Sequence, residues 1–385
     1  MADRAPLVML SAGEASGDQH AASLFRELQA IIPTVRGIGM GGPAMREAGI
    51  DIRFDSSGIG VIGLAEIARH YGEIRGALNR MRELARDERP DLLICVDYKE
   101  FNFRLAKAAK ALGIKVLFYV SPQVWAWRQG RVKTYGRIID HMAVIFPFEL
   151  PFYEAHGVPA TYVGHPLAGK VKATEPPAVV LARLGFLESK APLIGILPGS
   201  RSNELARLLP TLLSAAADLK ASHPDVRFVA FKAPTLDRQR LLDAGARHHL
   251  DLTIIEGQDY DVLQCCDAVM TVSGTATLEV ALLGVPMVIV YRLAALSYWI
   301  GRLLIKVPFI GLPNILRGKG IVREFIQDEA TPENIAAEIR KILDDPVYRN
   351  RMREELAAVR ETLGHLKGSV ELASLASKML EGKMV

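Results

Sequence analysis

The sequence predicts an α/β protein of two doubly wound domains, and three observations lead to this fold class. Near-continuous apolar runs alternate with helical patterns, as they do where parallel strands are covered on both faces. The same alternation begins again at residue 192. The chain of 385 residues is also too long for one ordinary hydrophobic core. We therefore expect two parallel sheets that face each other across a cleft.

Each half begins with a strand, a loop of small residues and a helix. In the first half these are residues 7–12, 13–18 and 19–31, and buried strands follow at 92–96 and 116–120. Ligands of open α/β sheets bind beyond the carboxyl ends of the strands, so we expect the chemistry in the loops that follow them.

The second half repeats this order around a loop at residues 198–201 and a helix at 203–220. Its expected strands are residues 193–197, 226–231, 252–255, 268–272 and 287–290. Glycine, proline and polar residues at 164–177 indicate the linker. The predicted parts are domains at residues 1–165 and 166–345, and C-terminal helices at 346–385 that pack on the first domain or on a partner.

Composition and charge argue against several classes of protein. The net charge of +4 is small for this length and does not indicate a nucleic-acid-binding protein. The spacing of Cys95, Cys265 and Cys266 suits neither a disulfide framework nor a metal site, which indicates a reducing compartment. The nine histidines lack zinc-binding spacing, and the N-terminus lacks a secretory signal pattern. The longest apolar run, 280–291, contains a Gly-Val-Pro turn, which argues against a membrane-spanning helix.

Two loops of the first half carry candidate sugar-binding residues. The loop from Gly13 to Asp18 lacks the G-x-G-x-x-G pattern of a dinucleotide site, and its acidic residues favour a sugar hydroxyl over a phosphate. A tight turn with a capping Ser16 or Asp18 explains the same pattern. Asp97 directly follows a buried strand, where a carboxylate within about 3 Å of a sugar hydroxyl can act as a general base. The alternative is an aspartate that caps the next helix.

The loop at residues 119–128 holds two of the three tryptophans, Trp125 and Trp127, and basic residues follow it. Aromatic and basic side chains together suit a phosphate or a lipid headgroup. A core aromatic cluster beside a solvated basic face explains the pattern equally well.

Two loops of the second half have the form of anion sites. In residues 198–201 a strand runs into a Gly-Ser turn, and Arg201 adds a fixed charge to the backbone N–H groups. This loop is not a Walker A motif, because no Gly-Lys-Ser/Thr follows. In residues 272–279 a strand, a small-residue turn and a helix can hold a diphosphate without a metal, and Glu279 can reach a ribose hydroxyl.

Two further patterns have simpler explanations. Asp259 and Asp261 frame a D-x-D sequence of the form that metal-dependent sugar transferases use. It directly precedes a short helical run at 262–266, so we expect helix capping there rather than a metal site. A hydrolase is not indicated, because neither Ser16 nor Ser121 lies in a G-x-S-x-G elbow.

Two stretches combine basic side chains with apolar and aromatic ones. Residues 292–319 hold five basic and no acidic side chains among leucines, isoleucines and aromatic residues, and residues 59–81 show a similar pattern. Such segments suit a membrane interface, and ordinary amphipathic core helices are the alternative. The two together favour a peripheral membrane role.

Taken in order along the chain, the loop motifs resemble those of the lipid-A-disaccharide synthase family. The motifs are SAGEASGD at residues 11–18, YVSPQVWAWR at 119–128, GHP at 164–166, LPGSR at 197–201, SGTA at 273–276 and LPN at 312–314. They span residue 11 to about residue 316, and their combination is highly specific, above all VSPQVWAWR. In one place the family often shows Pro-Asp before Phe-Asn, whereas this chain has Lys99-Glu100, which leaves the role of Glu100 open.

The resemblance implies a GT-B architecture of two Rossmann-like domains, with the donor site in the C-terminal one. It implies an inverting transfer of 2,3-diacylglucosamine from UDP-2,3-diacylglucosamine to the 6-hydroxyl of 2,3-diacylglucosamine 1-phosphate. The products are a β-1,6-linked disaccharide 1-phosphate and UDP, in lipid A assembly at the cytoplasmic face of the inner membrane. No cofactor or tightly bound metal is implied, and membrane phospholipids are expected partners.

The loops and the resemblance together predict the site residues. Asp97 matches the family's essential acid, so we expect it to be the catalytic base. The expected donor-site residues are Ser200, Arg201, Ser273, Gly274, Thr275, Glu279 and Asn314. The expected acceptor-site residues are Glu14, Ser16, Asp18, Asn102, Trp127 and Arg128.

Two alternative functions fit the same fold. A UDP-sugar 2-epimerase would use the nucleotide site without an acceptor, but the membrane-facing stretches and the double-tryptophan loop argue against it. A catalytically silent protein that binds a nucleotide sugar or a lipid is the other alternative.

Overall fold

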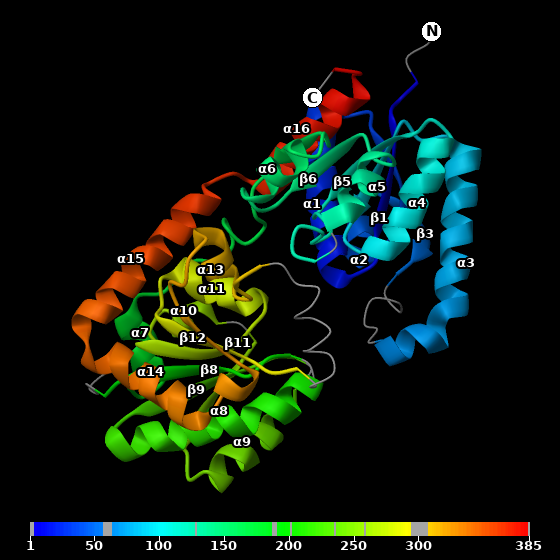
Figure 1. The fold of residues 1–385 in the computed structure, drawn as a ribbon. Helices are drawn as coiled ribbons and strands as arrows, with labels where there is room; N and C mark the ends of the chain where they lie inside the picture. The colour runs from blue at the N-terminus through cyan, green and yellow to red at the C-terminus, as the bar shows by residue number, and fades with distance from the viewer. Residues whose placement is uncertain are drawn as a thin grey trace. The chain divides into compact units, whose positions relative to one another are not determined.

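The computed structural model describes residues 4–56, 64–127, 129–186, 191–200, 202–234, 236–257, 259–293 and 307–383 (Figure 1). The chain divides into two compact units. The first unit is Met1–Pro166 together with His365–Val385, and the second is Leu167–Gly364.

Among the described residues, the strands of the first unit form one parallel sheet in the order β3-β2-β1-β4-β5-β6-β7. The strands are β1 (Leu7–Ala12), β2 (Arg36–Gly41), β3 (Asp51–Asp55), β4 (Leu92–Val96), β5 (Lys115–Tyr119), β6 (His141–Val144) and β7 (Ala160–Tyr162). The helices are α1 (Ala15–Ile31), α2 (Pro43–Glu47), α3 (Leu64–Glu88), α4 (Lys99–Ala111), α5 (Val132–Gly136), α6 (Glu149–Glu154) and α16 (Gly368–Leu380). The order of strands reverses between β1 and β4, which makes the edge beyond them the expected ligand site.

The first sheet is covered on both faces, which explains its unbroken apolar runs. In β4, Leu93 and Cys95 belong to one apolar cluster, whereas Ile94 and Val96 belong to the other. Helix α16 packs beside α1 and adds Leu372 and neighbouring side chains to the second cluster (Figure 1). The end of the chain therefore completes the core of the first unit.

The described strands of the second unit form a parallel sheet in the order β10-β9-β8-β11-β12-β13. The strands are β8 (Leu193–Leu197), β9 (Arg227–Lys232), β10 (Leu252–Glu256), β11 (Ala268–Val272), β12 (Met287–Tyr291) and β13 (Arg323–Ile326). The helices are α7 (Pro177–Arg183), α8 (Ser202–Ser222), α9 (Arg238–Arg247), α10 (Tyr260–Leu263), α11 (Thr275–Leu283), α13 (Leu312–Arg317), α14 (Pro332–Asp344) and α15 (Pro346–Leu363). Here the order reverses between β8 and β11.

The predicted fold class, two doubly wound parallel α/β domains, is confirmed. The predicted strand at 116–120 ends one residue earlier, because Val120 leaves the strand with a left-handed φ of 62°. The helices beyond residue 345, which the sequence grouped as one segment, divide between the units: α15 packs on α11, α13 and α14, and α16 packs on α1.

In the described part of the chain, no helix is both long enough and apolar enough to cross a bilayer. The two stretches predicted to face a membrane lie partly outside the described residues, which omit 57–63 and 294–306.

Candidate active site

The turn after β4 places Asp97 at the point where the first sheet reverses its strand order. Asp97 and Tyr98 have φ values of 52° and 41°, which residues other than glycine rarely adopt. The side chain of Asn102 holds this turn, because its amide donates to the carbonyls of Val96 (3.1 Å) and Asp97 (2.9 Å). Its own oxygen accepts the hydroxyl of Ser11 at 2.6 Å. Asn102 is fully buried and its hydrogen bonds hold the Asp97 turn, while its predicted contact with sugar stays a prediction.

The carboxyl group of Asp97 has one satisfied and one unsatisfied oxygen. Oδ1 accepts the N–H of Gly13 at 3.1 Å. Oδ2 is buried and has no hydrogen-bond partner among the described protein atoms. Burial raises the pKa of Asp97 to about 7; the charge of Glu14 adds to the shift, and the Gly13 amide opposes it. A carboxyl group with this pKa can accept and release a proton near neutral pH.

Glycines in the first loop are required by the residues that follow β4. A Cβ on Gly17 would lie 1.7 Å from Asp97 Oδ2, and one on Gly13 would lie 2.5 Å from the ring of Tyr98. Both distances are far inside van der Waals contact. The glycines therefore allow the Asp97 turn to pack closely against the amino end of α1.

The remaining predicted residues of this loop divide into two groups. Glu14 and Ser16 are exposed at the amino end of α1. Asp18 is buried and accepts three backbone N–H groups at the start of α2, those of Gly42 (2.7 Å), Ala44 (2.9 Å) and Met45 (3.1 Å). These bonds hold its carboxylate at the start of α2, and its predicted sugar contact stays a prediction.

The loop after β5 exposes one of its tryptophans. Trp127 is 41% exposed, while Trp125 is buried. Arg128 lies outside the described residues. Nearby, Glu100 pairs with Arg131, whose guanidinium lies 5.1 Å from the centre of the Phe103 ring. Glu100 thus ties α4 to the segment that follows the tryptophans.

In the second unit, two predicted loops leave neighbouring strands at the same edge. Strands β8 and β11 are parallel partners, with Leu197 opposite Thr271, so residues 198–200 and 273–275 follow side by side. Helix α11 begins at Thr275, and no side chain caps its amino end. Such an end carries unpaired N–H groups and a positive dipole, which suit a phosphate.

The side chains of these loops differ in accessibility. Ser200, Gly274 and Thr275 are exposed, whereas Ser273 is half-buried and donates to the Ile310 carbonyl at 3.3 Å. Arg201 lies outside the described residues.

Glu279 lies one turn into α11 and is 3% exposed. The hydroxyl of Tyr260 donates to its Oε1 at 3.3 Å. Burial, followed by the charge of Glu279, raises the pKa of Tyr260 to about 12. The sequence does not indicate Tyr260 as a partner of Glu279, because its only visible pattern there is the D-x-D that Tyr260 centres.

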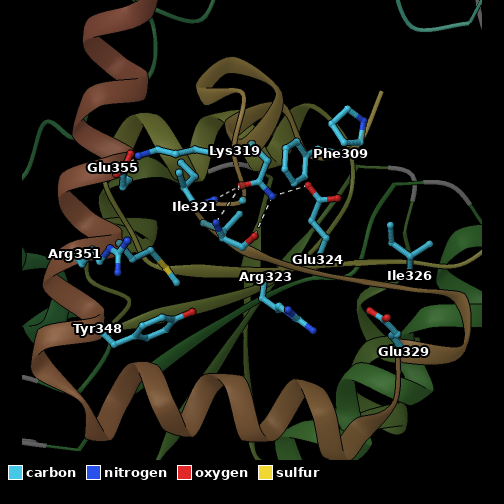
Figure 2. A pocket seen from close by; sticks show the side chains of 15 residues that line it. Phe309, Lys319, Ile321, Arg323, Glu324, Ile326, Glu329, Tyr348, Arg351 and Glu355 are labelled. Atoms are coloured by element: carbon cyan, nitrogen blue, oxygen red, sulfur yellow. Dashed lines mark hydrogen bonds and ion pairs between the residues drawn. The ribbon is translucent and has the colours of Figure 1, made fainter. Parts of the chain in front are cut away.

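Asn314 is buried at 1% exposure and does not present its amide to solvent. Its oxygen accepts the N–H groups of Ile321 (2.8 Å) and Val322 (3.0 Å), and its amide donates to the Val322 carbonyl (2.9 Å) and to Glu324 (2.6 Å). Figure 2 shows this cluster in the wall of a pocket that Lys319, Tyr348 and Arg351 also line. The hydrogen bonds of Asn314 give it a structural role, and its predicted nucleotide contact stays a prediction.

Glu324 links Asn314 to Ser273 through a chain of hydrogen bonds. Its carboxylate accepts the N–H groups of Ile310 (2.9 Å) and Gly311 (3.0 Å), and Ile310 in turn accepts the hydroxyl of Ser273. Asn314 and Glu324 thus support the segment on which the Ser273 turn rests.

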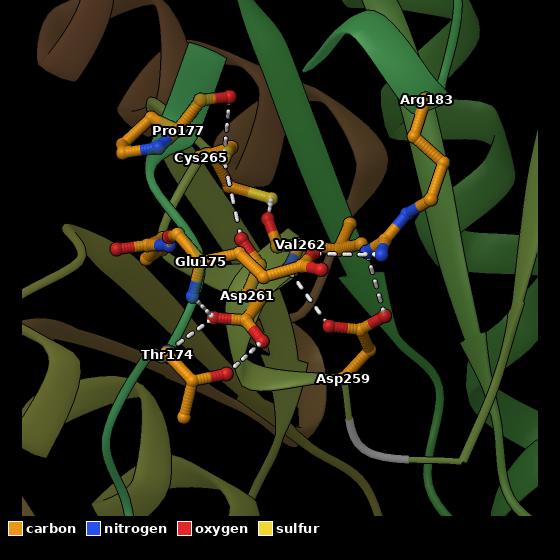
Figure 3. A network of polar contacts seen from close by, with 10 residues as sticks. Thr174, Glu175, Pro177, Arg183, Asp259, Asp261, Val262 and Cys265 are labelled. Carbon is orange, nitrogen blue, oxygen red and sulfur yellow. Dashed lines mark hydrogen bonds and ion pairs between the residues drawn. The ribbon is translucent and has the colours of Figure 1, made fainter. Parts of the chain in front are cut away.

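The D-x-D pattern is structural in this protein (Figure 3). Asp259 accepts the N–H of Val262 at 3.0 Å and caps α10, as predicted. Asp261 accepts the Thr174 hydroxyl (2.8 Å) and the Glu175 N–H (2.8 Å), which fastens the linker to α10. Within the described ranges, no three His, Cys, Asp or Glu side chains are grouped to hold a metal ion.

Comparison with known proteins identifies the family. Residues 8–375 match the family model for lipid-A-disaccharide synthetase. The lipid-A-disaccharide synthase of Geobacter sulfurreducens is 48% identical over 378 residues, which cover 98% of this chain and 98% of the relative. That of Nitrosococcus oceani is 48% identical over 383 residues, which cover 100% of this chain and 98% of the relative.

Solved structures with the same fold are more distant in sequence. The glycotransferase of kitacinnamycin has a TM-score of 0.65 and 18% identity, covering 98% of this chain and 100% of that one. A UDP-GlcNAc 2-epimerase from Neisseria meningitidis has a TM-score of 0.61 and 14% identity, covering 99% and 100%. These likenesses show a GT-B fold of two Rossmann-like domains. With the family model and the close relatives, they lead to one conclusion: the chain belongs to the lipid-A-disaccharide synthase family of glycosyltransferases.

Proposed function

We propose that the protein transfers 2,3-diacylglucosamine from UDP-2,3-diacylglucosamine to the 6-hydroxyl of 2,3-diacylglucosamine 1-phosphate. Membership of the family over residues 8–375 supports this reaction. The observation that carries it is the carboxyl group of Asp97, which is buried at the sheet reversal with one oxygen unpartnered. We assign to this unpartnered oxygen the proton of the acceptor's sugar hydroxyl.

The reaction is a direct displacement at the anomeric carbon of the donor sugar. Asp97 Oδ2 takes the proton from the acceptor hydroxyl as the new C–O bond forms. The bond from the anomeric carbon to the diphosphate breaks, and its electron pair leaves with UDP. Attack from the opposite face inverts the anomeric centre and produces the β-1,6 linkage.

Each domain supplies one part of the binding machinery in this proposal. The amino end of α11 at Gly274 and Thr275, with Ser200 and Arg201, stabilises the charge that develops on the leaving diphosphate. Glu279 binds the ribose. In the first domain Glu14 and Ser16 bind sugar hydroxyls. Trp127 and Arg128 bind the amphipathic acceptor through an exposed indole and a cation.

The proposal places the enzyme at the cytoplasmic face of the inner membrane as a peripheral protein. Both substrates carry two acyl chains, which keep them in a bilayer. The basic and apolar stretches at residues 59–81 and 292–319 support contact with membrane phospholipids.

Release of UDP tests the function directly. UDP should appear when UDP-2,3-diacylglucosamine and 2,3-diacylglucosamine 1-phosphate are both present, and not with the donor alone. Mass spectrometry should find a disaccharide 1-phosphate in the complete reaction. An epimerase would instead convert the donor sugar without an acceptor, and a silent binding protein would release no UDP in either case.

The pH dependence of kcat/KM for the acceptor should report the ionisation of Asp97. Burial raises its pKa to about 7, and a general base works only when deprotonated. We expect kcat/KM to fall about tenfold per pH unit below 7 and to level off above it. The same raised pKa affects the stability of the fold in the opposite direction. The folded protein holds the Asp97 proton more tightly than the unfolded chain, so the free energy of unfolding falls as the pH rises through 7. A rate profile that is level from about pH 5.5 upward would contradict the assignment.

A further inference from the structure

The loop after β5 buries one of its two tryptophans and exposes the other. We call residues 121–127 the tryptophan loop. Trp125 is 8% exposed, whereas Trp127 is 41% exposed. Only one residue separates them, so the position of Trp127 depends on how Trp125 is held.

Glu149 holds Trp125 from the neighbouring loop of the sheet. It is the first residue of α6, after β6, and is 1% exposed. Its Oε1 accepts the indole N–H of Trp125 at 3.0 Å, and its Oε2 accepts the backbone N–H of Phe146 at 3.0 Å. A buried carboxylate is a poor means of stabilising a fold, because apolar side chains of the same volume often do better. Its use here indicates a requirement for defined geometry.

The surroundings of Glu149 fasten the same loop at further points. The indole of Trp125 meets the ring of Phe148 edge-on, with ring centres 4.7 Å apart. The hydroxyls of Ser121 and Tyr153 lie 2.8 Å apart, which ties the start of the loop to α6. Burial raises the pKa of Glu149 to about 7, and the hydrogen bonds from Ser121, Phe146 and Trp125 oppose this shift.

The backbone at the start of the loop does not favour this conformation by itself. Val120 has a φ of 62°, in the left-handed region that β-branched residues avoid. Contacts elsewhere must therefore keep the turn in place. Two buried hydrogen bonds do so: Ser121 bonds Tyr153, and Trp125 bonds Glu149.

We infer that Glu149 is a positioning residue for the acceptor: it holds Trp125 inside so that the tryptophan loop presents Trp127 to the amphipathic sugar. The inference rests on the proposed function. Glu149 does not touch the reacting atoms in this scheme, and its effect passes through the loop to acceptor binding.

The variants Glu149→Gln and Trp125→Phe test the inference. Glutamine has one acceptor oxygen where two N–H groups need partners, and phenylalanine lacks the indole N–H. Each variant should raise KM for the acceptor about tenfold, with a smaller change in kcat and none in KM for the UDP donor. The effects should not add in the double variant, because both remove the same contact. Acceptor KM values within about twofold of wild type in both folded single variants would overturn the inference.

Asp140→Asn is the matched control. Asp140 is a carboxylate of the same domain that accepts the Val116 N–H at 2.8 Å, at the opposite edge of the sheet. This variant should lower the thermal midpoint without changing KM for the acceptor. An equal rise in the acceptor KM for Asp140→Asn would mean that general destabilisation explains the effect of the Glu149 variant, and it would overturn the inference.

Tryptophan fluorescence tests the role of Glu149 independently of the proposed reaction, because it needs no substrate. In a Trp127→Phe, Trp299→Phe background, Trp125 is the sole tryptophan, and its emission reports burial without substrate. Adding Glu149→Gln should shift this emission to the red. An unchanged spectrum would contradict the role of Glu149 in holding Trp125 inside. If wild-type protein released no UDP while the shift occurred, the proposed function would be wrong, and the role of Glu149 in burying Trp125 would still be supported.

Discussion

Replacing Asp97 with asparagine should lower kcat by about 10²–10⁴-fold while the protein stays folded. Asparagine keeps the size of the side chain and can still accept the Gly13 N–H, but it cannot take a proton from the acceptor. Burial disfavours the charged form of Asp97, so the neutral amide should leave the thermal midpoint at pH 8 unchanged or higher. UDP release under saturating substrates and a thermal melt measure the two effects.

Asp91→Asn is the control for this experiment. Asp91 stands at the other end of the same strand, where its carboxylate accepts the Leu7 N–H at 2.7 Å and pairs with Arg4. This variant should lose some stability and retain its turnover. Near-normal turnover in Asp97→Asn, or an equal loss in both variants, would remove Asp97 from the reaction.

Replacing Gly17 with alanine should reduce kcat by at least about 10²-fold, because it displaces the base rather than removing it. The new methyl group would lie 1.7 Å from Asp97 Oδ2, so the carboxylate must move. A misplacement of about 1 Å is enough for an effect of this size. Alanine is also a better helix former than glycine in α1 by up to about 1 kcal/mol, so circular dichroism should show the helix intact.

A double-mutant cycle assigns the effect of Gly17→Ala to Asp97. In an Asp97→Asn background, adding Gly17→Ala should cost little further activity, because the base is already absent. Multiplied losses in the double variant would mean that the first loop acts on the substrate independently of Asp97.

Sequence patterns were sufficient where the cause is local. Apolar runs gave the buried strands β4 and β11, because both faces of a parallel sheet are covered. Asp259 was predicted to cap α10, because a cap and its helix are neighbours in the chain.

Strand β2 was not predicted, since alternate glycines weaken the strand pattern. Tertiary packing requires one of them, because a Cβ on Gly39 would lie 1.9 Å from the Leu10 carbonyl oxygen.

By itself, the sequence determined the two doubly wound domains, the loops in which the chemistry is expected, and Asp97 as the base to be tested. Only the tertiary structure decided which polar side chains in those loops are buried in hydrogen bonds to the protein and which are exposed. Asn102 bonds Ser11, 91 residues away, and Asp18 bonds Gly42, 24 residues away. A buried polar group must find a hydrogen-bond partner, and folding selects that partner from distant parts of the chain. The motif therefore identifies the residue, whereas the packing around it decides what the residue does.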